Sequence, residues 1–324
     1  MLISHYFEFE EVVTGGIRES VTNQRQMLDH LGVTYVTEPR LDADVLHCNL
    51  MGPRSTYYAK RAAERGVPVV INTHVTAEDF GDSFRLTNLL ANPLRPYLEA
   101  VYSLGDQLVC PSSYNKDLLD GYTDVPNRII SNGVDASKLA GFDTLREEYL
   151  DRYDLTPPVV FMVGHVIKRK GLETFVETAR EMPEMDFIWF GPLDRKLKGR
   201  ETKRLIDESP ENCQFPGYVE DIRGAFAAGD IFFFPTHEEN EGIALLEAMI
   251  AGKSPVVRDI DTFEWLEDDH NCLKATAGFT GELERLQDRS LRERLGANAR
   301  ERGEEFKLEN VASAYEVLYE EVTA

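Results

Sequence analysis

Two glutamates, Glu239 and Glu247, have the spacing and the surroundings to bind a small polar ligand. The apolar run 231–234 before them predicts a buried strand, and Gly242 between them begins a predicted helix. The free amides at such a helix start attract anions, because the helix dipole and the unsatisfied N–H groups act at the same place. Two carboxylates around an anion site suit a ligand with both phosphate and hydroxyl groups, such as a nucleotide-sugar. Taken alone, the two glutamates would favour a solvated acidic turn.

The predicted helix after Gly242 sets the direction of the second carboxylate. Ile243, Leu246 and Ile250 repeat at helical spacing and predict the face that packs on the core. Glu247 lies about 40° from Ile243 around the helix axis, so we expect its carboxylate at the edge of the buried side. A lone charge there costs free energy unless something binds it, which favours a ligand contact.

Two further turns have residue types that suit phosphate. Gly15 and Gly16 follow the first predicted strand and open a helix, where paired glycines let the backbone approach a phosphate closely. An ordinary tight turn explains that pair equally well. Lys168, Arg169 and Lys170 follow another strand, and clustered cations at a strand's carboxyl end suit a diphosphate leaving group. A solvated basic turn is the alternative.

One histidine, His74, lies just past the apolar run 69–72. A lone histidine is more often structural than functional. At the end of a buried parallel strand, however, it could bind a sugar or an acceptor. Glu78 and Asp79 follow closely and are candidates for orienting an acceptor hydroxyl.

Strand-like and helix-like stretches alternate along the whole chain, which favours parallel sheets covered by helices. In the first half we expect strands at 2–5, 34–36, 44–48, 67–71, 107–110 and 128–130, and helices at 17–31, 54–65, 95–104 and 112–120. The second half restarts with a strand from Val159 and continues with the elements 172–181, 186–190, 231–234 and 308–322.

A polar stretch from Ser137 to Pro158 interrupts this alternation and predicts a domain boundary. The predicted fold class is α/β, with two doubly wound Rossmann-like domains facing across a cleft. Ligands of such sheets bind at the carboxyl ends of the strands, where the candidate residues lie.

Composition excludes several classes of protein. The 324 residues suffice for two domains. The net charge is −22, whereas a nucleic-acid partner requires a basic surface, so such a partner is not expected. Only 11 of 35 basic residues are lysine against 57 acidic residues, which suggests adaptation to high salt. Four scattered cysteines predict buried thiols in a reducing cytoplasm. The longest apolar runs fall short of a membrane span, so any membrane contact is expected to be peripheral.

The segment from Glu239 to Glu247 resembles the E-x7-E element of family 4 retaining glycosyltransferases, which have the GT-B fold. The resemblance implies that Glu239 binds the hydroxyls of the donor sugar and Glu247 the ribose. The residues between them are expected to contact the donor as well, namely Asn240, Glu241, Gly242 and Ile243.

The same resemblance assigns the phosphate-binding turns. It implies that Gly15 and Gly16 lie beside the donor diphosphate and that Lys170 is the family's leaving-group lysine. His165 stands where the family has an arginine, so Lys168, Arg169 or His165 itself must supply that contact.

Domain roles and a role for His74 also come from the resemblance. Family members carry a histidine at this place in a region that contacts the transferred sugar, which makes His74 a candidate catalytic residue with Glu239 and Lys170. Residues 1–145 would bind the acceptor, 146–307 the nucleotide-sugar, and 308–324 would pack back on the first domain as a helix.

Three looser segments, 74–84, 167–171 and 257–266, are similar to enzymes that glycosylate diacylglycerol. Between Phe84 and Leu104 apolar residues dominate, and tyrosines and arginines lie beside them, as at a membrane interface. Leu94, Leu98 and Val101 share one face of the predicted helix. A helix packed on its own domain is the alternative explanation.

The activity implied is transfer of a hexose, with UDP-glucose the expected donor, to a glycerolipid at the cytoplasmic membrane face. Transfer is expected to proceed with retention and without a cofactor or a metal. Asp42-Ala-Asp44 is formally a metal-binding D-x-D, but its aspartates simply begin a strand. A soluble or polyprenyl-linked sugar acceptor and a sugar-nucleotide epimerase of the same fold stay open as alternatives.

Overall fold

A computed structural model describes residues 1–80, 87–193 and 200–324, and the side chains of 79–93 and 194–200 lie outside that description. The chain divides into two compact units. Unit 1 includes the N-terminal segment from Met1, then Asn88–Val134 and Phe306–Ala324, and unit 2 includes Asp135–Glu305.

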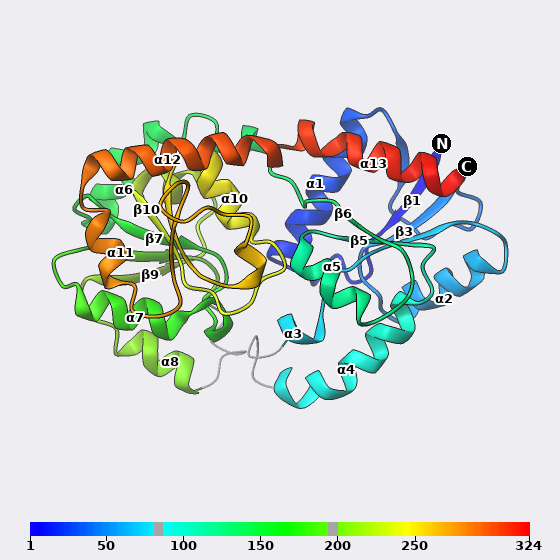
Figure 1. Cartoon of the computed structure of the whole chain (residues 1–324), viewed down its shortest axis with the longest axis horizontal. Coiled ribbons are helices and arrows are strands. Elements are labelled where there is room, and N and C mark those ends of the chain that lie inside the picture. The colour runs from blue at the N-terminus through cyan, green and yellow to red at the C-terminus, as the bar shows by residue number, and fades with distance from the viewer. Residues whose placement is uncertain (81–86, 194–199) are drawn as a thin grey trace. The chain divides into compact units, whose positions relative to one another are not determined.

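Unit 1 contains a parallel sheet of six strands (Figure 1). The strands are β1 (Leu2–Tyr6), β2 (Thr34–Val36), β3 (Val45–Cys48), β4 (Val69–Asn72), β5 (Gln107–Cys110) and β6 (Asn127–Ile129). They lie in the order β2-β1-β3-β4-β5-β6, with every pairing parallel. The order reverses direction at β1, as in doubly wound sheets, and this confirms the predicted α/β class.

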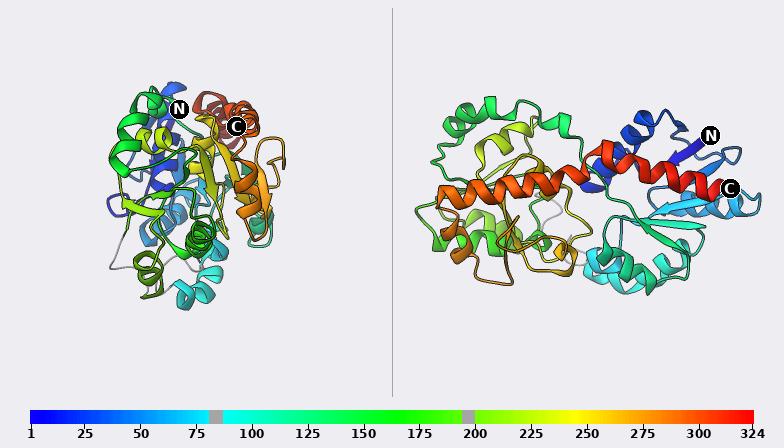
Figure 2. Two further views of the ribbon diagram at one scale, coloured as in Figure 1. Left: turned by 90° about the vertical axis from the view of Figure 1, so that its left-hand side faces the viewer. Right: turned by 45° about the horizontal axis from the view of Figure 1, so that its top comes forward.

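Helices cover both faces of this sheet. One core cluster joins the sheet to α1 (Gly16–His30) and α13 (Leu308–Thr323), which lie side by side in Figure 1 and in the right-hand view of Figure 2. The other cluster joins it to α2 (Pro53–Ala63), α4 (Thr87–Tyr102) and α5 (Ser113–Asp120). In α13 the buried residues recur every three or four positions, which gives the helix one apolar stripe to pack on the sheet: Leu308, Val311, Ala312, Tyr315, Leu318 and Tyr319.

Unit 2 contains a second parallel sheet in the order β12-β11-β10-β7-β8-β9. Its strands are β7 (Val160–Val163), β8 (Phe187–Phe190), β9 (Cys213–Gly217), β10 (Ile231–Phe234), β11 (Ser254–Arg258) and β12 (Leu273–Ala275). Strands β8 and β10 are buried along their whole length, because helices cover both faces of a parallel sheet.

The helices of unit 2 are divided between the faces of that sheet. In Figure 1, α7 (Leu172–Glu181) and α8 (Arg200–Asp207) lie on one side, and α10 (Ile243–Ile250) and α12 (Arg289–Gly303) on the other. The remaining helices are α6 (Arg146–Tyr153), α9 (Arg223–Ala228) and α11 (Thr280–Arg285). No described helix in the chain is both long enough and apolar enough to cross a membrane.

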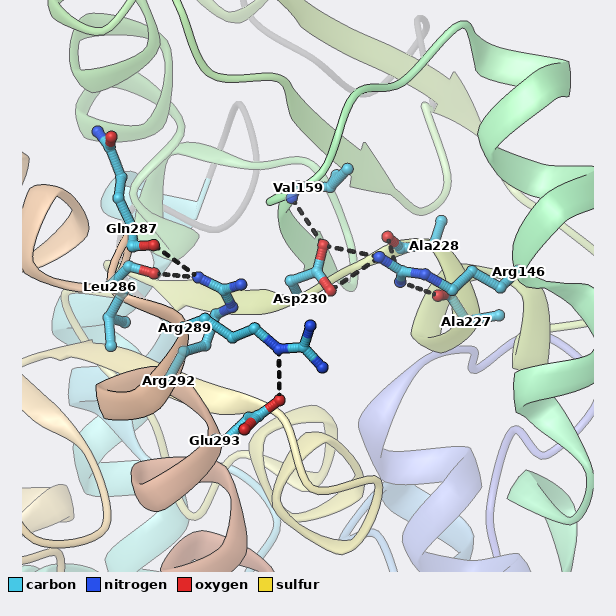
Figure 3. A network of polar contacts seen from close by, with 10 residues as sticks. All are labelled: Arg146, Val159, Ala227, Ala228, Asp230, Leu286, Gln287, Arg289, Arg292 and Glu293. Carbon is cyan, nitrogen blue, oxygen red and sulfur yellow. Dashed lines mark hydrogen bonds and ion pairs between the residues drawn. The ribbon is translucent and has the colours of Figure 1, made fainter.

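A polar anchor holds the start of β10, the strand that leads to the candidate glutamates. The carboxylate of Asp230 accepts hydrogen bonds from the backbone amide of Val159 at 2.9 Å and from the guanidinium of Arg146 at 2.9 Å (Figure 3). Arg146 also donates to the carbonyl oxygen of Ala227 at 2.8 Å. These contacts join α6 and α9 to the amino ends of β7 and β10, and the candidate site lies at the carboxyl ends of the same strands.

Two predicted helix faces need correction. In α10 the fully buried residues include Leu245, Leu246 and Met249, whereas Ile243 is only partly buried, like Glu247. Leu246 and Ile250 are buried as predicted, and only Ile243 does not belong to the packed face. Both Ile243 and Glu247 are partly buried, which agrees with a Glu247 carboxylate at the edge of the buried side.

The second correction concerns the predicted membrane face of α4. Leu98 and Val101 are buried in the core of unit 1, and Leu94 packs against the same cluster. This face is therefore covered by the unit's own core, and the alternative explanation is right for it. The side chains of the residues from Phe84 to Pro93 lie outside the described part of the chain.

Candidate functional site

Two loops at the carboxyl edge of the unit 2 sheet form the candidate site. One follows β7, the other follows β10, and these two strands are neighbours in the sheet. The backbone amide of His237 donates to the carbonyl oxygen of Arg169 at 2.8 Å, and the Thr236 hydroxyl donates to the same oxygen at 3.3 Å. These bonds hold the basic turn of the first loop against the acidic turn of the second.

Close approach of the loops depends on Gly171. Its φ is 81°, in the left-handed region, and an added Cβ would lie 2.3 Å from the carbonyl oxygen of Pro235. Both the strain and the clash oppose any side chain there. The glycine thus lets the 3₁₀ turn Lys168–Lys170 approach the end of β10.

Replacing Gly171 with alanine should lower the free energy of unfolding by about 3 kcal/mol, since backbone strain and overpacking add. Gly141→Ala is the matched control in unit 2, because Gly141 has a φ of 69° but nothing within 4 Å of an added Cβ. It should cost about 1 kcal/mol, the strain alone. Urea unfolding measures both, and equal losses in the two variants would contradict the close approach at Pro235.

The loops bring Glu239 together with two cations. Glu239 is only 6% exposed, and its Oε1 contacts Nζ of Lys170. The guanidinium of Arg169 lies 3.9 Å from the same oxygen. The Thr262 hydroxyl donates to the backbone carbonyl of Glu239 at 2.8 Å and fixes the main chain there. A buried carboxylate beside two positive groups can accept hydrogen bonds from sugar hydroxyls while the cations attract phosphate.

The cation cluster divides in two. Arg169 and Lys170 are 13% and 16% exposed and both face Glu239. Lys168 instead pairs with Glu201 of α8, and its side chain is 41% exposed. The structure therefore favours Arg169 over Lys168 as the second cation beside the carboxylate. His165 is partly buried earlier in the same loop.

Helix α10 begins directly after the acidic turn. Its N-cap, Gly242, has a φ of 92°, and Glu241 before it is 3% exposed. Asn240, Ile243 and Glu247 are partly buried. The amides of the first helical turn follow the loop that holds Glu239, which is the arrangement that binds a phosphate group.

In unit 1 the predicted site residue His74 belongs to a buried polar network. It is 9% exposed, and burial lowers its pKa to about 4. Its Nε2 lies 3.5 Å from Oδ1 of Asn49, which accepts a hydrogen bond from the Asn72 amide at 2.7 Å. The Asn72 amide also donates to Gln24 at 2.8 Å, and Gln24 is 3.0 Å from His5.

Two more histidines extend this network away from the site. Burial, with the charge of Arg25 as the second cause, lowers the pKa of His5 to about 3. Burial also lowers the pKa of His47 well below its usual range, and His47 Nδ1 lies 2.6 Å from the Tyr319 hydroxyl. Neither His5 nor His47 was predicted from the sequence as a site residue. In both cases the signal is a histidine in the second half of a strand that begins with two apolar residues.

The three buried histidines predict loss of stability in acid. In the unfolded chain each takes up a proton near pH 6.5, whereas the folded pKa values of His5 and His74 are about 3 and 4. Between those limits the unfolded state binds more protons, so the free energy of unfolding falls as pH falls. Each histidine contributes a slope of about 1.4 kcal/mol per pH unit.

His5→Gln tests this slope, because glutamine can keep an amide in the network but does not titrate. From pH 7.5 to 5, we expect the variant to lose about 2 kcal/mol less stability than the wild type. The exposed His30, on the same helix as Gln24, provides the control variant His30→Gln. Urea unfolding at constant ionic strength measures the effect, and parallel pH curves for wild type and His5→Gln would contradict it.

The remaining predicted residues lie in unit 1. Gly15 caps α1 with a φ of 75°, and Gly16 begins the helix. Glu78, on the short helix α3 (Ala77–Phe80), accepts a hydrogen bond from the Tyr122 hydroxyl at 2.6 Å and lies 3.3 Å from Arg95. The side chain of Asp79 lies outside the described residues.

The D-x-D aspartates have structural partners. The carboxylate of Asp44 accepts a hydrogen bond from the backbone amide of Leu2 at 2.6 Å, at the start of β1. Asp42 pairs with Arg40. The Asp44 contact agrees with a role in beginning the strand.

Comparisons with known proteins agree on one family. The model of Glycosyltransferase Family 4 matches residues 18–138, and that of Glycosyl transferases group 1 matches residues 157–288. The processive diacylglycerol alpha-glucosyltransferase of Acholeplasma laidlawii is 31% identical over 95% of this chain and 94% of its own. The alpha-galactosylglucosyldiacylglycerol synthase of Streptococcus pneumoniae is 33% identical over 37% of this chain and 33% of its own.

Solved structures show the same fold at low identity. HepE of Anabaena, crystallised with UDP and glucose, matches with a TM-score of 0.76 at 14% identity over 98% of both chains. The sucrose-phosphate synthase of Thermosynechococcus elongatus matches with a TM-score of 0.76 at 15% identity over 99% of both chains.

Proposed function

The chain belongs to glycosyltransferase family 4, with the GT-B fold, and we propose that it transfers a hexose from a nucleotide-sugar to a glycerolipid. The observation that best supports binding of a nucleotide-sugar donor is the buried Glu239 carboxylate beside Lys170 and Arg169. The choice of a glycerolipid acceptor is supported by the two relatives whose names describe the synthesis of glycosylated diacylglycerols.

On the donor side, Glu239 would accept hydrogen bonds from the hydroxyls of the sugar. Lys170, Arg169 and the start of α10 would attract the diphosphate and stabilise the charge that develops on it as the bond to the sugar breaks. Glu247, farther along α10, would bind the ribose. UDP-glucose is the first donor to test, since the relative over 95% of this chain is a glucosyltransferase.

On the acceptor side, His74 would contact the sugar or the acceptor hydroxyl from unit 1. A pKa near 4 keeps the imidazole neutral at pH 7, so it can donate or accept a hydrogen bond without bringing a charge. Glu78 and Asp79 are further candidates for the acceptor, and Gly15 with Gly16 for the donor diphosphate.

We propose that transfer retains the anomeric configuration and needs no metal. In a same-face mechanism the leaving diphosphate takes the acceptor's proton, so no carboxylate of the protein has to act as nucleophile, unlike in retaining glycosidases. Asp44 supports metal independence, since its carboxylate binds the Leu2 amide. Activity that survives EDTA would agree, whereas a strict requirement for Mn²⁺ or Mg²⁺ would contradict the proposal.

Lipid mass spectrometry tests the function as a whole. The enzyme is incubated in molar KCl, which suits its acidic composition, with UDP-glucose and a total lipid extract, and Glu239→Gln serves as the control. A lipid one hexose heavier that is absent from the control supports the proposal. Donor consumption without a glycolipid would favour a soluble acceptor or an epimerase. A product that forms only when intact membranes are present would support transfer at the membrane surface. We propose the cytoplasmic face.

A further inference from the structure

Unit 1 contains a cavity of about 190 Å³ beside His74. Its described lining is mostly apolar and comes from the loop after β1, the loop after β3 and helix α4; the residues that matter here are Phe9, Met51, His74, Leu94, Tyr97 and Leu98. Of these residues, only His74 has a role in the proposed glycosyl transfer.

The polar groups around the cavity are already bonded to the protein. The Tyr97 hydroxyl donates to the carbonyl oxygen of Met51 at 2.6 Å, and the Tyr102 hydroxyl donates to that of Val75 at 2.6 Å. The side-chain amide of Asn72 donates hydrogen bonds to Gln24 and Asn49. A buried water needs two to four polar partners, so the described wall suits hydrocarbon better than water.

Phe9, at the cavity, combines exposure with a strained backbone conformation. Its side chain is 51% exposed, although large apolar side chains normally pack in the core. Its φ is 65°, a left-handed conformation that is rare and costly for a bulky residue. The neighbouring Glu8 fixes this loop, because its carboxylate accepts hydrogen bonds from the amides of Arg54 at 3.0 Å and Ser55 at 2.6 Å.

We propose that this cavity binds the part of the acceptor's hydrocarbon chain nearest the polar head, an inference that rests on the proposed function. His74 lies at the cavity and can receive the head, while Phe9, Leu94 and Leu98 contact the chain. An apolar cavity of roughly 150 Å³ holds one benzene molecule, so this one accommodates a short run of methylene groups. The rest of the chain would pass Phe9 toward solvent or a membrane.

Binding of 1-O-octylglycerol, measured by calorimetry against glycerol, tests the cavity without requiring catalysis. Wild type should bind octylglycerol at least about tenfold more tightly than glycerol. Phe9→Ser should weaken octylglycerol binding about tenfold, the loss expected when roughly two methylene contacts disappear. The control is Val12→Ser, since Val12 is 73% exposed on the same loop and does not line the cavity.

Leu94→Ser is a second variant and should also weaken octylglycerol binding. If Leu94→Ser does not fold, the result for Phe9→Ser alone tests the proposal. Equal binding of octylglycerol and glycerol, or binding that Phe9→Ser leaves unchanged, would overturn the cavity proposal. Hexose transfer to dioctanoylglycerol is measured in parallel. Transfer without any effect of Phe9→Ser on binding would refute the cavity and keep the proposed function. Binding that depends on Phe9, without transfer to any lipid, would refute the acceptor assignment and with it the proposed function.

Discussion

Replacing Glu239 with glutamine should lower kcat/KM for hexose transfer by about 10²–10³-fold, the usual effect of removing one group that stabilises the transition state. Glutamine keeps the shape of the side chain but loses its charge. Glu239 is 6% exposed and its carboxylate contacts Lys170, so solvent does not make up for the lost charge. The sugar hydroxyls would then meet a weaker hydrogen-bond acceptor, and Lys170 would lose its ion pair with Glu239.

The matched control for this variant is Glu238→Gln, one residue earlier in the same turn. Glu238 contributes its backbone carbonyl to Arg169, and glutamine preserves that carbonyl. Its activity should stay within about twofold of wild type. Glu239→Gln is assayed below its own melting temperature, since removing the carboxylate beside a largely buried lysine also costs stability. Equal activity of the two variants would remove Glu239 from the proposed donor site.

Much of the fold could be predicted because its elements carry strong local patterns. The apolar run 231–234 coincides with β10, and 172–181 coincides with α7. Helix α4 shows the limit, because it begins at Thr87 and not near Arg95. Pro93 and Pro96 lie inside this helix. Because proline is unfavourable inside a helix, the local sequence did not predict the first turns.

Contacts within the candidate site were less accessible from sequence. Each loop could be placed at the carboxyl end of a strand, yet Lys170 and Glu239 are 69 residues apart. Their contact requires β7 and β10 to be neighbours and Gly171 to let the loops approach. The choice of Arg169 over Lys168 likewise depends on where α8 places Glu201. Such choices are made by tertiary packing, which single-residue patterns do not encode.

Replacing Lys170 with methionine should lower kcat for transfer about 100-fold, because the positive charge proposed to stabilise the leaving diphosphate disappears. Methionine keeps an apolar stem of similar length but loses the ammonium group, whose Nζ lies 5.2 Å from the centre of the Phe234 ring. Lys203→Met is the control, since that exposed lysine lies on α8 and pairs only weakly with Asp207 at 3.6 Å. A loss confined to KM would assign Lys170 to ground-state binding of the donor and contradict its role in departure of the leaving group.

Stability of the same variants separates the ion pair from the chemistry. Lys170→Met leaves the Glu239 carboxylate with Arg169 at 3.9 Å, and Glu239→Gln leaves Lys170 as a second cation beside Arg169. Each single change should therefore destabilise by about 2–3 kcal/mol, less than for a fully buried pair because the lysine is 16% exposed. The double variant removes both charges and should cost about 1–3 kcal/mol less than the sum. Additive losses in urea unfolding would mean that the two groups are not coupled in the free enzyme. With strong coupling, the proposed donor diphosphate would compete with Glu239 for Lys170, and donor binding would then release the carboxylate toward the sugar.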